Sequence, residues 1–150
     1  MSFSYVLREE SRIAVVRGEG PGSFAESKRT LRVLAGDLSD RPPCGIVLDV
    51  RRLRYTPSAE EAHECAVLLR TLAHAYRGPI AVVVTPGFRR DVARLFATFC
   101  GSLNGPEVEV FSRVGDALDW VATEYATEYA TEYATEYVAP VGAWWRRRGM

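Results

Sequence analysis

Two short, largely apolar runs constrain the fold of this 150-residue chain more than any other feature of its sequence. They are Ile46–Val50 and Ile80–Val84, and both are rich in β-branched residues. Turn-forming residues precede each run, Pro42–Pro43 in one case and Gly78–Pro79 in the other. Apolar runs of this length, bounded in this way, are typical of strands that are covered on both faces. The sequence therefore predicts a central, largely parallel sheet.

Further strands and helical patterns alternate with these two runs. Strands are predicted at residues 3–7, 13–17, 46–50, 80–84 and 108–111, and helices at residues 24–35, 58–76, 88–101 and from 114 onward. The charged segment between the first two strands favours a hairpin. The order β-β-α-β-α-β-α-β-α predicts an α/β fold with a mixed, mostly parallel sheet covered by helices.

Length, charge and cysteine content limit the classes of protein. A chain of 150 residues with 47% hydrophobic residues fits one domain with a sizeable core. With 19 basic and 19 acidic residues, no net charge attracts nucleic acid or an anionic membrane. The chain shows neither a signal-peptide pattern nor 18 consecutive apolar residues. The three scattered cysteines, Cys44, Cys65 and Cys100, suggest buried thiols in a reducing compartment. We therefore expect a cytoplasmic protein without stable membrane association.

A perfect tandem repeat follows the start of the last predicted helix. Residues 122–137 read ATEY four times, which places each tyrosine about one helical turn after the previous one. We therefore predict a domain over residues 1–121, a helix extended by the repeat over residues 122–137, and a flexible Trp/Arg tail over residues 138–150. Because the core pattern is complete by about Val121, removal of residues 122–150 is expected to leave most thermal stability intact.

A helix-capping signal lies between the first apolar run and the helix that follows it. Ser58 and Glu61 have the spacing of a capping box, in which the serine hydroxyl caps the helix. Thr56, followed by Pro57, is an alternative cap. Ser58 is also a candidate for regulatory phosphorylation, because a helix N-terminus accommodates a phosphate.

Several local segments are similar to those of one protein family. Gly18–Glu19 follows the second strand, Ala25–Glu26 begins the first helix, and Leu48–Ser58 forms a strand and loop that end in a serine. Thr85–Pro86 follows the next strand. Over roughly residues 3–122 the chain thereby resembles the STAS domain, the fold of bacterial anti-sigma-factor antagonists. Ser58 aligns with the regulatory serine of that family.

The STAS resemblance implies a non-catalytic module that acts through protein–protein contact. It suggests partner switching or sigma-factor regulation, with an anti-sigma factor, a kinase or another regulator as the protein partner. The Sec14-like domains share this fold, so binding of a small molecule or lipid is the alternative. That alternative requires a deep apolar pocket.

The loop before the second long helix is the expected contact surface for the partner. It contains arginine and tyrosine, which are the residue types that anchor protein interfaces. The predicted contact residues are Arg51, Arg52, Arg54, Tyr55 and Thr56. A basic face on the third helix, formed by Arg89, Arg90 and Arg94, is either an anion site or a solvated surface.

No catalytic or metal-binding motif occurs in the sequence. His63 and His74 are eleven residues apart on a predicted helix, which is too far for a shared metal. Asp49 lies near the end of a central strand, where α/β folds often place a functional carboxylate, but it has no evident partner. We therefore expect no enzyme activity, no cofactor and no metal. An enzyme that uses Asp49 or His63 remains a third possibility.

Overall fold

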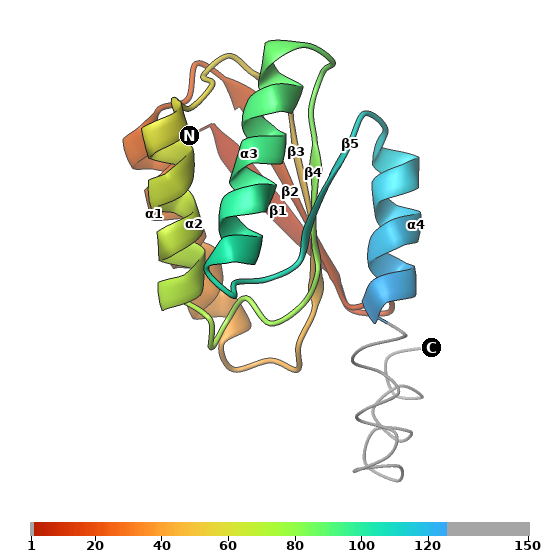
Figure 1. Cartoon of the computed structure of the whole chain (residues 1–150). Coiled ribbons are helices and arrows are strands. Elements are labelled where there is room, and N and C mark those ends of the chain that lie inside the picture. The colour runs from red at the N-terminus through yellow and green to blue at the C-terminus, as the bar shows by residue number, and fades with distance from the viewer. Residues whose placement is uncertain (1, 126–150) are drawn as a thin grey trace, which may run out of the picture.

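Five strands and four helices alternate along residues 2–125, the part of the chain that the computed structural model describes (Figure 1). The strands are β1 (Phe3–Arg8), β2 (Ile13–Gly20), β3 (Gly45–Leu53), β4 (Ile80–Val83) and β5 (Val108–Phe111). The helices are α1 (Phe24–Leu38), α2 (Ala59–Thr71), α3 (Phe88–Ser102) and α4 (Val114–Tyr125). This order confirms the predicted one. Most of the repeat, residues 126–137, and the tail of residues 138–150 lie outside the described residues.

The sheet is mixed, as predicted, and its strands follow one another in sequence order, β1-β2-β3-β4-β5. β1 pairs with β2 in antiparallel fashion, and the other neighbouring strands are parallel. The apolar runs occupy the centre of the sheet because both of its faces are covered there. Val47 of β3 and Val83 of β4 are accordingly 0% exposed.

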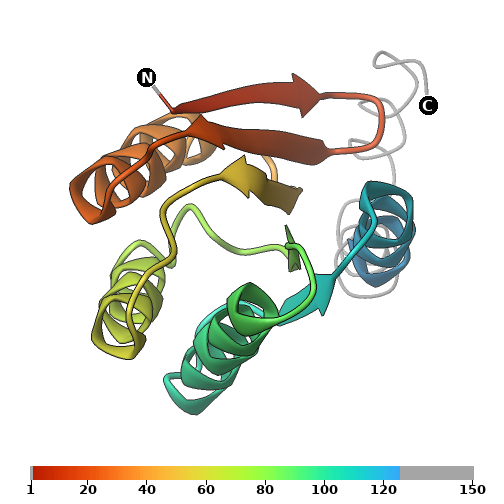
Figure 2. The ribbon, with the colours of Figure 1, turned by 90° about the horizontal axis from the view of Figure 1, so that it is seen from above.

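Helices cover both faces of the sheet, but unequally. α1, α2 and α3 lie side by side on one face, and α4 lies alone on the other (Figure 2). The three-helix face forms the larger core, in which Ile46 packs with Leu34 and Leu69. On the opposite face, Val47 and Val121 belong to a smaller core. The main interior of the protein therefore lies between the sheet and α1–α3.

A buried cation connects the β1–β2 turn to the end of α4. Arg12 is 0% exposed and adopts a positive φ of 56°. Its Nη2 donates a hydrogen bond to the Pro42 carbonyl oxygen over 2.7 Å, and the Tyr125 hydroxyl is another hydrogen-bond partner of the guanidinium. Tyr125 is itself 6% exposed. α4 is thus anchored at a tyrosine of the first ATEY unit.

Several element ends differ from the sequence-based expectation by one to five residues, and two of them border the predicted contact loop or the main core. β3 continues to Leu53 because its pairing with β2 resumes after a register shift, with Arg52 opposite Glu19. α2 ends at Thr71, five residues before its expected end, because the chain then turns and buries Tyr76. The Tyr76 hydroxyl donates a hydrogen bond to the Leu31 carbonyl, which joins this turn to α1. No helix within residues 2–125 is long and apolar enough to cross a bilayer.

Candidate functional site

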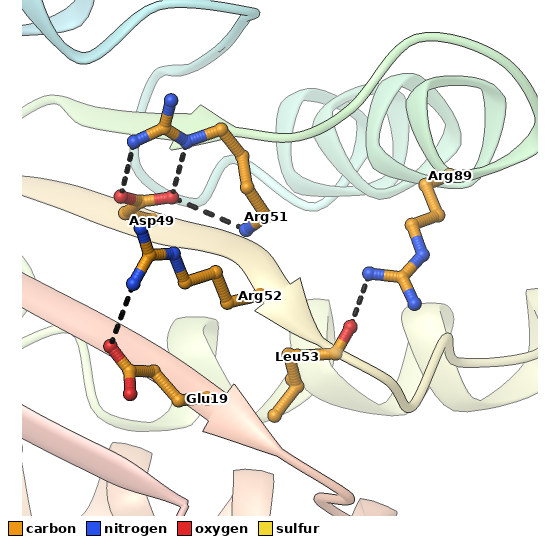
Figure 3. Close-up of polar contacts among 6 residues, drawn as sticks. All are labelled: Glu19, Asp49, Arg51, Arg52, Leu53 and Arg89. Atoms are coloured by element: carbon orange, nitrogen blue, oxygen red, sulfur yellow. Dashed lines mark hydrogen bonds and ion pairs between the residues drawn. The ribbon is translucent and has the colours of Figure 1, made fainter.

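Asp49 and Arg51 form a local ion pair near the carboxyl end of β3 (Figure 3). Arg51 Nε and Nη2 each donate to a different carboxylate oxygen of Asp49 over 2.9 Å, and the Arg51 backbone N–H donates to Oδ1 over 3.2 Å. Burial alone would raise the pKa of Asp49, but these hydrogen bonds hold it below its usual value. Asp49 is therefore an ionised partner of Arg51, and the geometry gives it no role as a general base.

The remaining arginines of the predicted contact surface are more accessible. Arg52 lies at the end of β3, with 82% of its side chain exposed, and its Nη1 is 4.0 Å from Glu19 Oε1. Arg54 begins the loop and is also exposed. Arg51 and Arg52 thus lie in the strand rather than in the loop. The five predicted contact residues therefore lie at the end of β3 and in the loop that follows it.

Arg89 of α3 is hydrogen-bonded to the backbone at the start of this loop. It lies at the start of α3 and donates through Nη1 to the Leu53 carbonyl (Figure 3). Its Nη2 donates to the Arg54 carbonyl over 2.9 Å. The two hydrogen bonds connect the end of β3 to α3 and restrict the loop. The basic face predicted on α3 is thereby divided, because Arg90 instead donates to the Ser112 hydroxyl.

Ser58 is the N-cap of α2, and both halves of the capping box are formed. The Glu61 N–H donates to Ser58 Oγ over 3.1 Å, and the Ser58 N–H donates to Glu61 Oε1 over 2.9 Å. The Tyr55 hydroxyl donates to the same carboxylate oxygen over 2.8 Å. The hydrogen bond from the Ser58 N–H, together with that from Tyr55, lowers the pKa of Glu61. Thr56 does not cap this helix, and Ser58 remains solvent-exposed.

Replacing Ser58 with alanine should cost about 1 kcal/mol of stability, because the Glu61 N–H loses its acceptor. Ser58→Asp should fall within a few tenths of a kcal/mol of the wild type, since aspartate also caps helices well. Urea unfolding of the three proteins measures both differences. Equal losses in both variants would show that the serine is important for a reason other than capping.

An apolar cavity of about 150 Å³ lies between the sheet and α1–α3. Its floor is the sheet, where Leu48 and Val82 contribute side chains. Leu31 of α1 and Ala93 of α3 contribute to the opposite wall. At the carboxyl ends of the strands the cavity reaches the loop after β3, where Thr56 is only half-buried. The cavity and the predicted contact loop therefore adjoin.

Three residues that line the cavity were not predicted to do so from the sequence. They are Cys65, Tyr76 and Arg89. Burial raises the pKa of Cys65 to about 11, so this thiol is protonated at neutral pH. Helical spacing alone predicted α3 to carry a basic face, and it contained no information about the loop that Arg89 meets. Tyr55 and Thr56, predicted as partner contacts, also line the cavity.

His63 and Asp49 have separate partners, and His74 lies beyond the end of α2 rather than on the helix that was predicted to carry both histidines. The His63 ring packs edge-to-face against Phe99, with ring centroids 4.9 Å apart. Asp49 is paired with Arg51 as described above. Within residues 2–125, no group of three histidine, cysteine or acidic side chains has the geometry of a metal site.

Comparison with known proteins places the fold. The sequence matches no known protein family and no curated protein. The structure, however, is similar to that of an uncharacterized protein of the DUF3478 family from Shewanella loihica PV-4, which has a SpoIIAA-like fold. The TM-score is 0.58 at 15% sequence identity, and the match covers 80% of this chain and 94% of the other. The chain has the SpoIIAA-like fold.

The SpoIIAA-like fold is the fold of STAS domains and anti-sigma-factor antagonists, so the resemblance found in the sequence is confirmed at the level of the fold. This SpoIIAA-like fold is generally non-catalytic. At 15% identity the neighbour indicates architecture alone, and its own description assigns it no function. Any function must therefore be argued from the loop and the cavity of this chain.

Proposed function

We propose that this SpoIIAA-like chain is a non-catalytic binding module that holds a small apolar molecule between its sheet and α1–α3. The observation that carries the proposal is the cavity of about 150 Å³ in the larger core. Protein interiors are close-packed, and voids much larger than a water molecule are rare. In another protein, an apolar cavity of about this volume binds a benzene molecule. This cavity is therefore large enough for a small organic ligand.

A ligand in this cavity would stabilise the folded state by mass action, because the unfolded chain has no such cavity to bind it.

Filling the cavity with protein atoms should abolish binding of an apolar probe. Ala93 lines the cavity from α3, so in Ala93→Leu the larger side chain would occupy part of the space. We expect benzene to raise the melting temperature of the wild type and to leave that of Ala93→Leu unchanged. Calorimetry with and without saturating benzene measures both shifts.

Ala97→Leu is the matched control, because Ala97 lies one turn later on α3 and does not line the cavity. This variant should keep the benzene-dependent shift of the wild type. If the wild type shows no shift, or if Ala93→Leu keeps the full shift, the cavity does not bind apolar molecules and the proposal fails.

A protein partner at the β3–α2 loop is the second candidate function. The loop is restrained by Arg89 at its start and by the Ser58 capping box at its end. Arg52 and Arg54 are exposed on this restrained segment. Pre-organisation reduces the entropy that binding would otherwise cost. The positive charge of these residues fits an acidic protein surface, as partner switching by a regulator or kinase would require.

Charge removal on the loop tests this second function. A partner retained from lysate of the native host by the wild type should be lost by the double variant Arg52→Ala/Arg54→Ala. It should still be retained by Arg29→Ala, which removes an exposed charge on α1. Retention by the double loop variant would exclude the loop as the docking surface.

A further inference from the structure

Arg89 is a cation on the wall of an otherwise apolar cavity. The other ionisable lining residues are neutral at pH 7. Burial raises the pKa of Cys65 to about 11, and it also raises the pKa values of Tyr55 and Tyr76. Among the described lining residues, Arg89 therefore carries the only full charge at neutral pH. Its charge sets the kind of polar group that a ligand could present to the protein.

The hydrogen bonds of Arg89 leave it able to bind an anion. A guanidinium has five N–H donors, and the bonds to the Leu53 and Arg54 carbonyls use two of them. Both acceptors are neutral. No carboxylate within residues 2–125 forms an ion pair with Arg89. A planar carboxylate matches the fork of the guanidinium, and charge-assisted bonds of this kind are roughly twice as strong as neutral ones.

The lining of the cavity indicates the rest of the ligand. The cavity follows the sheet from Ile80 to Val84, which corresponds to about 13 Å at roughly 3.3 Å per residue. It also extends across the sheet, because Val16 of β2 and Leu48 of β3 contribute to the same lining. Apolar side chains of this kind fit a hydrocarbon group. Arg89 lies at the carboxyl end of the strands, next to the half-buried Thr56.

We infer that the cavity takes a monocarboxylic acid of about six to eight carbons, a size set by the volume that holds benzene elsewhere. The carboxylate contacts Arg89 at the end of the cavity near the loop, and the hydrocarbon group lies along β3 and β4. This inference rests on the proposed function, and it adds the head group of the ligand.

Titration calorimetry with matched probes tests the head group and the hydrocarbon group separately. Octanoate should bind at least tenfold more tightly than 1-octanol, because a hydrogen bond to a charged group contributes that much. From butanoate to octanoate, affinity should rise about fourfold with each methylene group.

Variants of two neighbouring arginines test which side chain binds the carboxylate of the ligand. Arg89→Gln should weaken octanoate binding at least tenfold and change 1-octanol binding less than about twofold. Arg90→Gln is the control, because Arg90 is the next residue but does not line the cavity. It should bind both probes like the wild type. Arg89→Lys should restore part of the octanoate affinity, since it keeps the charge.

The outcomes separate this inference from the function on which it rests. If 1-octanol binds as tightly as octanoate, or if Arg89→Gln weakens both equally, the carboxylate assignment is overturned and the apolar pocket stands. If neither octanoate nor 1-octanol binds, and benzene does not bind either, the inference and the proposed function fail together.

Discussion

Replacing Gly78 with alanine is expected to cost more than about 3 kcal/mol or to prevent folding. A Cβ atom at this position would lie 2.1 Å from the Cys44 carbonyl oxygen and 3.1 Å from the Gly45 backbone nitrogen. Both are backbone atoms, so no side-chain rotation relieves the clash. Ordinary overpacking costs about 1–3 kcal/mol, and displacement of backbone should exceed that range. The displaced segment leads into β3, whose Ile46 N–H donates to the Pro79 carbonyl.

Gly36→Ala is the matched control for this substitution. Gly36 lies inside α1, and a Cβ there would have no neighbour within 4 Å. Alanine should therefore stabilise the protein by roughly 0.5–1 kcal/mol through its higher helix propensity. Chemical denaturation of both variants provides the comparison. A Gly78→Ala protein as stable as the wild type would show that the chain does not pass this closely beside Cys44.

Removing residues 122–150 is expected to lower stability by about 3 kcal/mol or more, the range seen when a buried aromatic side chain is lost. This revises the expectation that the core is complete by about Val121, because Tyr125 is 6% exposed. The truncation also removes a hydrogen-bond partner of Arg12, a cation that is 0% exposed. A buried charge that loses a partner is strongly destabilising.

A chain that ends at Tyr125 is the matched control for this truncation. It keeps the first ATEY unit and removes only residues 126–150, and we expect it to unfold within about 1 kcal/mol of the full-length protein. In the full-length chain, Tyr125→Phe should lose about 1.5–3 kcal/mol, because it removes a hydrogen bond to a charged group. Equal stability of both truncated chains would contradict the anchoring role of Tyr125.

The parallel part of the sheet could be predicted because its strands are buried on both faces. This burial makes Ile46–Val50 and Ile80–Val84 apolar with little polar alternation, which is a local signal. The end of β3 could not be placed in the same way. The sequence predicts that Arg51 and Arg52 lie in the loop after β3. In the structure they belong to β3, because its pairing with β2 resumes at Glu19 after a register shift. Pairing across a shift depends on another strand, so no local pattern contains it.

The capping role of Ser58 followed from its spacing to Glu61, but the cavity did not follow from any pattern. Leu31, Leu48, Val82 and Ala93 come from four different elements, and each would fit a filled core equally well. Whether such residues meet or leave a space depends on how the helices sit on the sheet. The contact of Arg89 with the loop could not be predicted either, because it depends on where α3 lies relative to β3. Phosphorylation of Ser58 and the identity of a partner stay predictions.

The most direct test of the ligand pocket is to locate a bound apolar probe by nuclear magnetic resonance. With benzene bound to the wild type, the pocket predicts intermolecular nuclear Overhauser effects to the methyl groups of Leu48 and Val82, which line the cavity. Val6 and Phe88 are 66% and 71% exposed and mark the outer surface. Effects confined to these two residues, with none at Leu48 or Val82, would contradict the account.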